Sequence, residues 1–234
     1  MSPVSHLYEK LQEKVAAWRK DGYPVDRYPA IAEILEYATL PESGTLRFLR
    51  AAQLRALETY WYLRLVEGTP HIFDLYTRTY PRTTELLEAL GLDSDPIKEL
   101  VVDEGKEALW ERLRSDEAFV KEQRLESVHE TLTLDYPSYI LALAMGAGKT
   151  ILIGAIVVTE FAMALEYPGA SDDGFRFVQN ALVFAPGLTI LESLRELADV
   201  DWSQVLPPRL YRPFEAYLLP TSCGILTSSK ESGG

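Results

Sequence analysis

One stretch decides the fold, Tyr139-Ile-Leu-Ala-Leu-Ala-Met-Gly-Ala-Gly-Lys-Thr150. Its first half is apolar and typical of a buried strand, and the glycines that follow mark a loop. The residues after the loop, from Ile151 to about Leu165, stay apolar over the length of a helix. The stretch therefore predicts a strand, a glycine loop and a helix in that order.

The loop has the residue types that polyphosphate binding requires. Glycine at 146 and 148 lets the backbone approach phosphate oxygens and turn its N–H groups toward them, and the helix adds its positive end. Lys149 supplies a charge for the β and γ phosphates, and Thr150 supplies a hydroxyl for Mg²⁺. The formal pattern also asks for glycine at the position of Leu143. We predict that ATP and Mg²⁺ bind to Met145, Gly146, Ala147, Gly148, Lys149 and Thr150.

Two other interpretations of this stretch compete with phosphate binding. The segment from Ile140 to Phe161 is about long enough to cross a bilayer, but Lys149 lies at its centre with Gly146 and Gly148 beside it. A plain buried helix would leave that lysine charge in apolar surroundings without a counter-charge. A bound phosphate provides the counter-charge.

Composition limits the class of protein. The chain has 234 residues, 47% of them hydrophobic and 25% charged, which is enough for a real core in one large or two small domains. A single cysteine, Cys223, excludes an internal disulfide and is typical of a reducing compartment. No signal peptide is visible, so we expect a cytoplasmic protein without a membrane segment. The net charge of −12 argues against nucleic-acid binding by bulk charge alone.

The chain before the phosphate loop reads as helical. Residues 1–44 contain two expected helices, the first ending at Asp21-Gly22 and the second spanning Ala30 to Tyr37. Residues 45–135 begin with a long expected helix from Thr45 to Glu67 and continue with shorter helical patterns.

The pattern of the sequence changes after residue 135. The run Phe177 to Ala185 predicts a second strand, and an expected helix from Thr189 to Ala198 follows it. Strand, helix and strand at this spacing are typical of a right-handed βαβ unit with parallel strands. The predicted fold class is therefore α/β: a helical N-terminal region, and then in residues 136–234 the first half of a parallel-sheet P-loop lobe of the RecA type.

Three blocks resemble the ATPases of helicase superfamily two. Met145 to Thr150 is similar to the family's motif I. The run from Ala181 to Leu194 resembles the strand, turn and helix of motif Ia, and Leu49-Arg50-x-x-Gln53-x-x-Ala56-Leu57 resembles the upstream glutamine block. The nearest likeness is the first part of the restriction subunit of type III systems, which carries a DEAD/DEAH-type ATPase.

The resemblance implies a function and a set of roles. It implies ATP-dependent translocation on double-stranded DNA in a phage-defence system, with a methyltransferase subunit as a possible partner. By the same resemblance Gln53 would read the adenine edge, and Pro186 and Thr189 would lie near DNA phosphate. In the family the glutamine block lies about twenty residues before the loop. Here the return of Gln53 to the loop requires residues 69–135 to form a helical insert.

The chain departs from the family in its carboxylates. A working motor needs a strand ending in Asp-Glu after motif Ia, where Asp holds Mg²⁺ and Glu activates water, and it needs an arginine finger. Leu100-Val-Val-Asp103-Glu104 has such a pattern but precedes the loop, and reads better as a helix with a solvated acidic face. We therefore expect weak ATP binding and hydrolysis near zero. A catalytically inert interaction or regulatory protein, or another P-loop enzyme such as a kinase, stays open as an alternative.

Overall fold

The computed structural model describes residues 4–92, 94–170, 175–183 and 194–218. The chain divides into two compact units that interleave along the sequence. Residues 1–25 and 55–144 form the first unit, and residues 26–54 and 145–234 form the second. The chain therefore passes from one unit to the other three times, and the second passage, between Leu54 and Arg55, falls inside the helix α3 (Ala51–Trp61).

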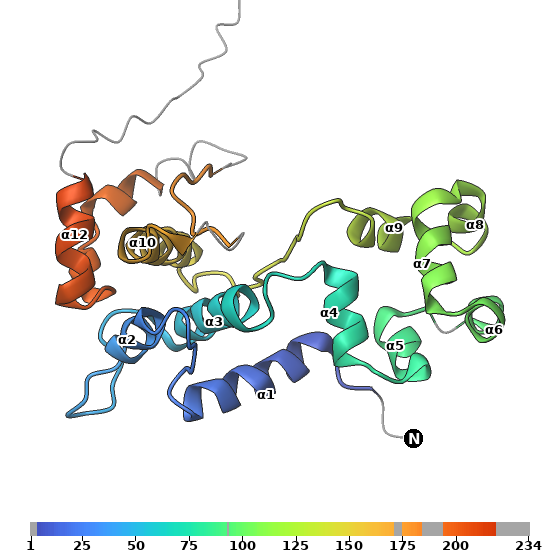
Figure 1. The fold of residues 1–234 in the computed structure, drawn as a ribbon, viewed down its shortest axis with the longest axis horizontal. Coiled ribbons are helices and arrows are strands. Elements are labelled where there is room, and N and C mark those ends of the chain that lie inside the picture. The colour runs from blue at the N-terminus through green and yellow to red at the C-terminus, as the bar shows by residue number, and fades with distance from the viewer. Residues whose placement is uncertain (1–3, 93, 171–174, 184–193, 219–234) are drawn as a thin grey trace, which may run out of the picture. The chain divides into compact units, whose positions relative to one another are not determined.

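The first unit is built of helices (Figure 1). They are α1 (Leu7–Lys20), the second part of α3, the π-helical turn η1 (Tyr62–Val66), α4 (Ile72–Thr79), α5 (Thr83–Leu90), α6 (Asp95–Glu104), α7 (Lys106–Ser115), α8 (Glu117–Glu122) and α9 (Glu126–Leu132). The core of α4 to α9 gathers leucines, valines and phenylalanines from each helix, with Leu113 and Ile97 among the most buried. Glycine and proline separate two of these helices: α5 ends at Gly91, whose φ of 70° only glycine adopts easily, and Asp95-Pro96 opens α6.

The second unit surrounds one long apolar helix, α10 (Lys149–Glu166). Its other elements are α2 (Ala30–Tyr37), the first turn of α3, the 3-10 turns η3 (Glu196–Asp199) and η4 (Trp202–Gln204), and α12 (Pro208–Leu218). The helices α2 and α12 both pack against α10, as Figure 1 shows. Arg209 on α12 ties the three together, since its guanidinium binds Glu33 of α2 at 2.7 Å and Glu166 of α10 at 2.6 Å.

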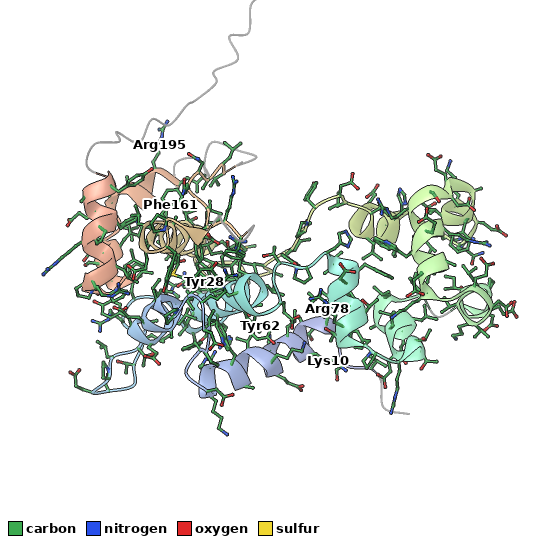
Figure 2. The ribbon with its side chains drawn as sticks, viewed as in Figure 1. Lys10, Tyr28, Tyr62, Arg78, Phe161 and Arg195 are labelled. Carbon is green, nitrogen blue, oxygen red and sulfur yellow. The ribbon has the colours of Figure 1, made fainter. Side chains whose placement is uncertain are left out.

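An aromatic cluster holds the chain around the C-terminal end of α10. Tyr28, labelled in Figure 2, makes edge contacts with the rings of Tyr167 and Phe177 and a tilted contact with Phe175. The hydroxyl of Tyr167 accepts the backbone N–H of Ala30 at 3.0 Å, at the first residue of α2. The side chain of Glu160, buried on α10, accepts the backbone N–H of Val178 at 2.7 Å. Residues 175–178 are thus held by side chains.

The predicted α/β fold is wrong for the described residues. They contain no strand, and their only β pairing is one isolated antiparallel bridge between Thr39 and Leu46. Residues 139–144 and 177–183, where strands of a parallel RecA-like lobe were expected, run without a neighbouring ladder. Apolar residues with high strand propensity form a strand only where a second backbone pairs with them. Here Ile140 is 90% exposed and Leu182 is 80% exposed, and only the start of the second run, at Phe177, is buried.

Several helix predictions differ in detail. The helix Ala30 to Tyr37 is confirmed at both ends. The long helix predicted from Thr45 begins only at Ala51, because residues 39–47 form a turn. In this turn the backbone N–H of Leu40 donates to the carbonyl of Thr45, and the backbone N–H of Arg47 donates to the carbonyl of Ala38. The first half of the expected helix Thr189 to Ala198 lies outside the described residues, and its second half is helical and runs into the 3-10 turn η3. Helix α12 was not predicted, although Leu210 and Phe214, four residues apart, form its buried face.

Candidate phosphate-binding site

The glycine loop lies in the second unit and leads directly into α10. Gly146 and Gly148 have φ values of 75° and 77°, in the left-handed region where a Cβ is strained. Gly148 is the N-cap residue, and α10 begins at Lys149. The loop of residues 145–148 and the helix that starts at Lys149 are therefore where the sequence places them, although the strand before them is absent.

The start of α10 is suited to an anion. The backbone N–H groups of the first helical residues have no partner within the helix and point out of its N-terminal end. No side chain caps this end, and its first turn carries no acidic residue. The aligned peptide dipoles place a partial positive charge here. Lys149 is exposed, and Thr150 beside it is partly exposed.

Two side chains from the start of α3 hold the loop. The side-chain amide of Gln53 donates to the carbonyl oxygen of Gly148 at 2.8 Å. The guanidinium of Arg50 donates to the carbonyl oxygen of Gly146, also at 2.8 Å. A Cβ on Gly148 would overlap the Gln53 amide nitrogen, whereas a Cβ on Gly146 would meet nothing within 4 Å. A side chain at 148 would therefore displace the Gln53 amide from its present position.

These two bonds orient the amides of the loop. In a planar trans peptide the N–H points opposite to the C=O of the same unit. Because the carbonyls of Gly146 and Gly148 point to α3, the N–H groups of Ala147 and Lys149 point away from it. The second of these directions is also the outward direction at the start of α10. Both amides thus face away from the bracing side chains, as a phosphate cradle requires.

The structure describes most of the predicted site residues, but not all of them. Met145, Gly146, Ala147, Gly148, Lys149 and Thr150 form one continuous loop and helix start, with the Met145 side chain 99% exposed. Gln53 lies against this loop despite the 95 residues that separate it from Gly148. The predicted DNA contacts Pro186 and Thr189 lie outside the described residues. The loop brace of Arg50 was missed, although its position three residues before Gln53 at a helix start was a visible signal.

The acidic pair Asp103-Glu104 does not end a strand. Both residues are exposed in the last turn of α6, and Glu104 pairs with Arg112 at 3.0 Å. The solvated helical face predicted for this pair is therefore present, and the pair does not end a strand. Within the described ranges no three acidic, histidine or cysteine side chains gather closely enough to hold a metal ion.

Comparisons with known proteins give no relative. No family model, no curated protein and no solved structure matches the chain. In the part of the chain that the structure describes, no helix combines the length and the apolar character needed to cross a bilayer.

Proposed function

We propose that residues 145–150 bind the phosphates of MgATP. The observation that carries the proposal is the run of two left-handed glycines into the uncapped N-terminus of an 18-residue helix. Such a start offers several N–H donors and half a positive charge to one anion. The chain as a whole carries a net charge of −12, so this local positive potential is a specific feature of the loop, where an anion can bind.

Each residue of the loop has a proposed role. The N–H groups of Ala147 and Lys149 donate to phosphate oxygens, and the Lys149 ammonium neutralises the β and γ phosphates. The Thr150 hydroxyl would hold the Mg²⁺ that accompanies the phosphates, and the ion would neutralise part of their charge. Met145 forms the exposed rim of the loop.

The resemblance to type III restriction helicases extends this proposal. It makes the chain part of a cytoplasmic DNA translocase of a phage-defence system, acting on double-stranded DNA with a methyltransferase subunit. The acidic surface of this chain then leaves most of the DNA affinity to other parts of that assembly.

A titration with a fluorescent ATP analogue tests the binding proposal. We expect saturable, Mg²⁺-dependent binding that Lys149→Ala weakens at least about tenfold, which corresponds to about 1.4 kcal/mol. Lys98→Ala is the matched control, because Lys98 is an exposed helical lysine of the first unit and its loss changes the net charge equally. Equal affinities for the wild type and Lys149→Ala would refute the proposal.

A second candidate is a nucleotide-binding regulatory protein that does not hydrolyse ATP. The helical, exposed setting of Asp103 and Glu104 favours it, because the usual strand-borne pair of carboxylates is not found among the described residues. Phosphate release measured with and without duplex DNA separates the two. DNA-stimulated release on the order of 1 s⁻¹ supports the translocase, and binding without release supports the regulator.

A further inference from the structure

We infer that Gln53 positions the phosphate loop and reads no base, so that the site selects a triphosphate chain and not adenine. The inference rests on the proposed function and specifies its substrate class. It assigns Gln53 a role other than the one implied by the helicase resemblance.

Both ends of the Gln53 carboxamide are already used. Its oxygen accepts the backbone N–H of Arg50 at 2.7 Å, and its nitrogen donates to the Gly148 carbonyl at 2.8 Å. These partners also fix which way the amide faces, because an N–H needs an acceptor and a C=O needs a donor. The first bond closes the start of α3, where Gln53 is the third helical residue after Arg50.

Burial completes the argument against base reading. To recognise adenine, an amide must present its oxygen and its nitrogen together to the base edge. The Gln53 residue is 3% exposed, so almost none of its surface reaches a ligand. Turning the amide outward would break two hydrogen bonds and leave the N–H of Arg50 and the carbonyl of Gly148 to find other partners.

Arg50 provides a second brace of the same kind. Its bond to the Gly146 carbonyl, together with the Gln53 bond, holds two carbonyls of the loop toward α3. The N–H groups of Ala147 and Lys149 are thereby held in the opposite direction before any ligand arrives. Preorganised donors of this kind favour the phosphates equally, whatever base is attached to them.

Selectivity for the base can be measured on the wild-type protein, without any variant. ATP, GTP, CTP, UTP and inorganic tripolyphosphate are titrated by calorimetry in the presence of Mg²⁺. We expect the four nucleotides to bind with affinities within about threefold of one another, a difference of less than 1 kcal/mol. Tripolyphosphate should compete with each of them. ATP binding that exceeds GTP binding by more than about tenfold would overturn the inference while leaving the proposed function intact.

Two variants test the positioning role. Gln53→Glu keeps an oxygen for the N–H of Arg50 but loses the donor to Gly148, whereas Gln53→Ala loses both bonds. We expect Gln53→Glu to weaken the binding of every ligand, tripolyphosphate included, by a common factor of about five to ten. That factor is the effect of one lost hydrogen bond. Affinities are compared at a temperature at which thermal melts show each variant folded, so that a loss of folding does not mimic a loss of binding.

Each outcome has one meaning. A loss confined to ATP would assign Gln53 to the base and refute the inference. An unchanged affinity for all ligands in a folded Gln53→Glu protein would refute the positioning role. If the wild type binds neither nucleotides nor tripolyphosphate, the phosphate site itself is wrong, and the inference falls with it.

Discussion

Gly154 on α10 lies directly against the indole ring of Trp202 in η4. A Cβ built on Gly154 would be 2.7 Å from Cζ2 of that ring and 3.0 Å from the Leu197 side chain, and closer still to Cη2. The ring is fixed in place, since its N–H donates to the Leu197 carbonyl at 3.2 Å. Glycine at this position lets the segment 197–204 pack closely on the long helix.

We predict that Gly154→Ala destabilises the protein, although alanine favours a helix over glycine by about 1 kcal/mol. Forcing a methyl group into a packed contact costs about 1–3 kcal/mol, so we expect a net loss of roughly 1 kcal/mol in the free energy of unfolding. Urea denaturation followed by circular dichroism measures it. In a cycle with Trp202→Leu, the double variant should lose less stability than the sum of the single variants. Strict additivity would show that the two residues do not clash.

The two loop glycines give a matched pair of variants. Gly146→Ala and Gly148→Ala carry a similar backbone cost, of about 1–2 kcal/mol, because both φ values are near 75°. Only the alanine at 148 meets the Gln53 amide. We expect Gly148→Ala to melt at the lower temperature, and the difference from Gly146→Ala to disappear when Gln53 is also changed to alanine. A difference that persists in that background would contradict the brace.

A buried carboxylate holds α1 to α3 within the first unit. Glu58 is fully buried and accepts hydrogen bonds from the Arg19 guanidinium, with Nε at 2.6 Å, and from the Tyr23 hydroxyl at 2.6 Å. We predict that Arg19→Met costs about 3 kcal/mol, since it leaves a buried charge poorly compensated, and that Arg19→Met with Glu58→Leu recovers most of it. Denaturant unfolding measures both variants.

The exposed pair of Arg112 and Glu104 serves as the control for this prediction. Both side chains are about half exposed, so Arg112→Met should cost less than about 1 kcal/mol. Equal losses for Arg19→Met and Arg112→Met would mean that burial of Glu58 does not decide the energy.

Stability should fall at alkaline pH because of buried tyrosines. Burial raises the pKa of Tyr80 to about 12, and burial with the nearby Glu67 carboxylate raises the pKa of Tyr62 to about 12. The unfolded value is about 10, so the folded state favours the neutral phenol. This contribution is fully present below about pH 10 and is lost as the pH rises through about 12.

Tyr80→Phe isolates one of these groups. Its hydroxyl donates to the Ser5 carbonyl at 2.6 Å, so the variant should be less stable than the wild type at pH 9 by about 1 kcal/mol. The gap should narrow toward pH 12, because the ionised wild-type phenol no longer donates. Urea unfolding at several pH values measures the gap, and a constant gap would exclude Tyr80 as a source of the pH dependence.

Local signals in the sequence predict local structure here. Gly148 indicates the start of α10, because a glycine in the left-handed conformation ends the loop there. Gly91 indicates the end of α5, because a left-handed glycine terminates that helix. Pairing between segments is not a local property. The run at 139–144 has the residues of a strand, yet a strand depends on a partner backbone that its own residues do not specify.

The contact between Gln53 and the loop also shows how far the sequence alone predicts contacts between distant segments. The likeness of the glutamine block indicated that Gln53 belongs near the phosphates, but not which of its atoms would be engaged. That depends on the N–H of Arg50 and the carbonyl of Gly148, which meet only in the folded chain. Helix α12 was missed because Pro207 precedes it, Pro208 is its first residue and Pro213 lies within it, which masks the spacing of its buried residues.

The interleaved course of the chain has a consequence for its biosynthesis. Residues 26–54 leave the ribosome early, but their partners in the same unit begin only at Met145. At a typical elongation rate of about 5–20 residues per second, α2 and the start of α3 wait several seconds before α10 exists to cover them. The nascent chain thus carries the apolar face of α2, with Ile31, Ile34 and Leu35, uncovered while the intervening helices form, and a chaperone that shields this face would act during that interval.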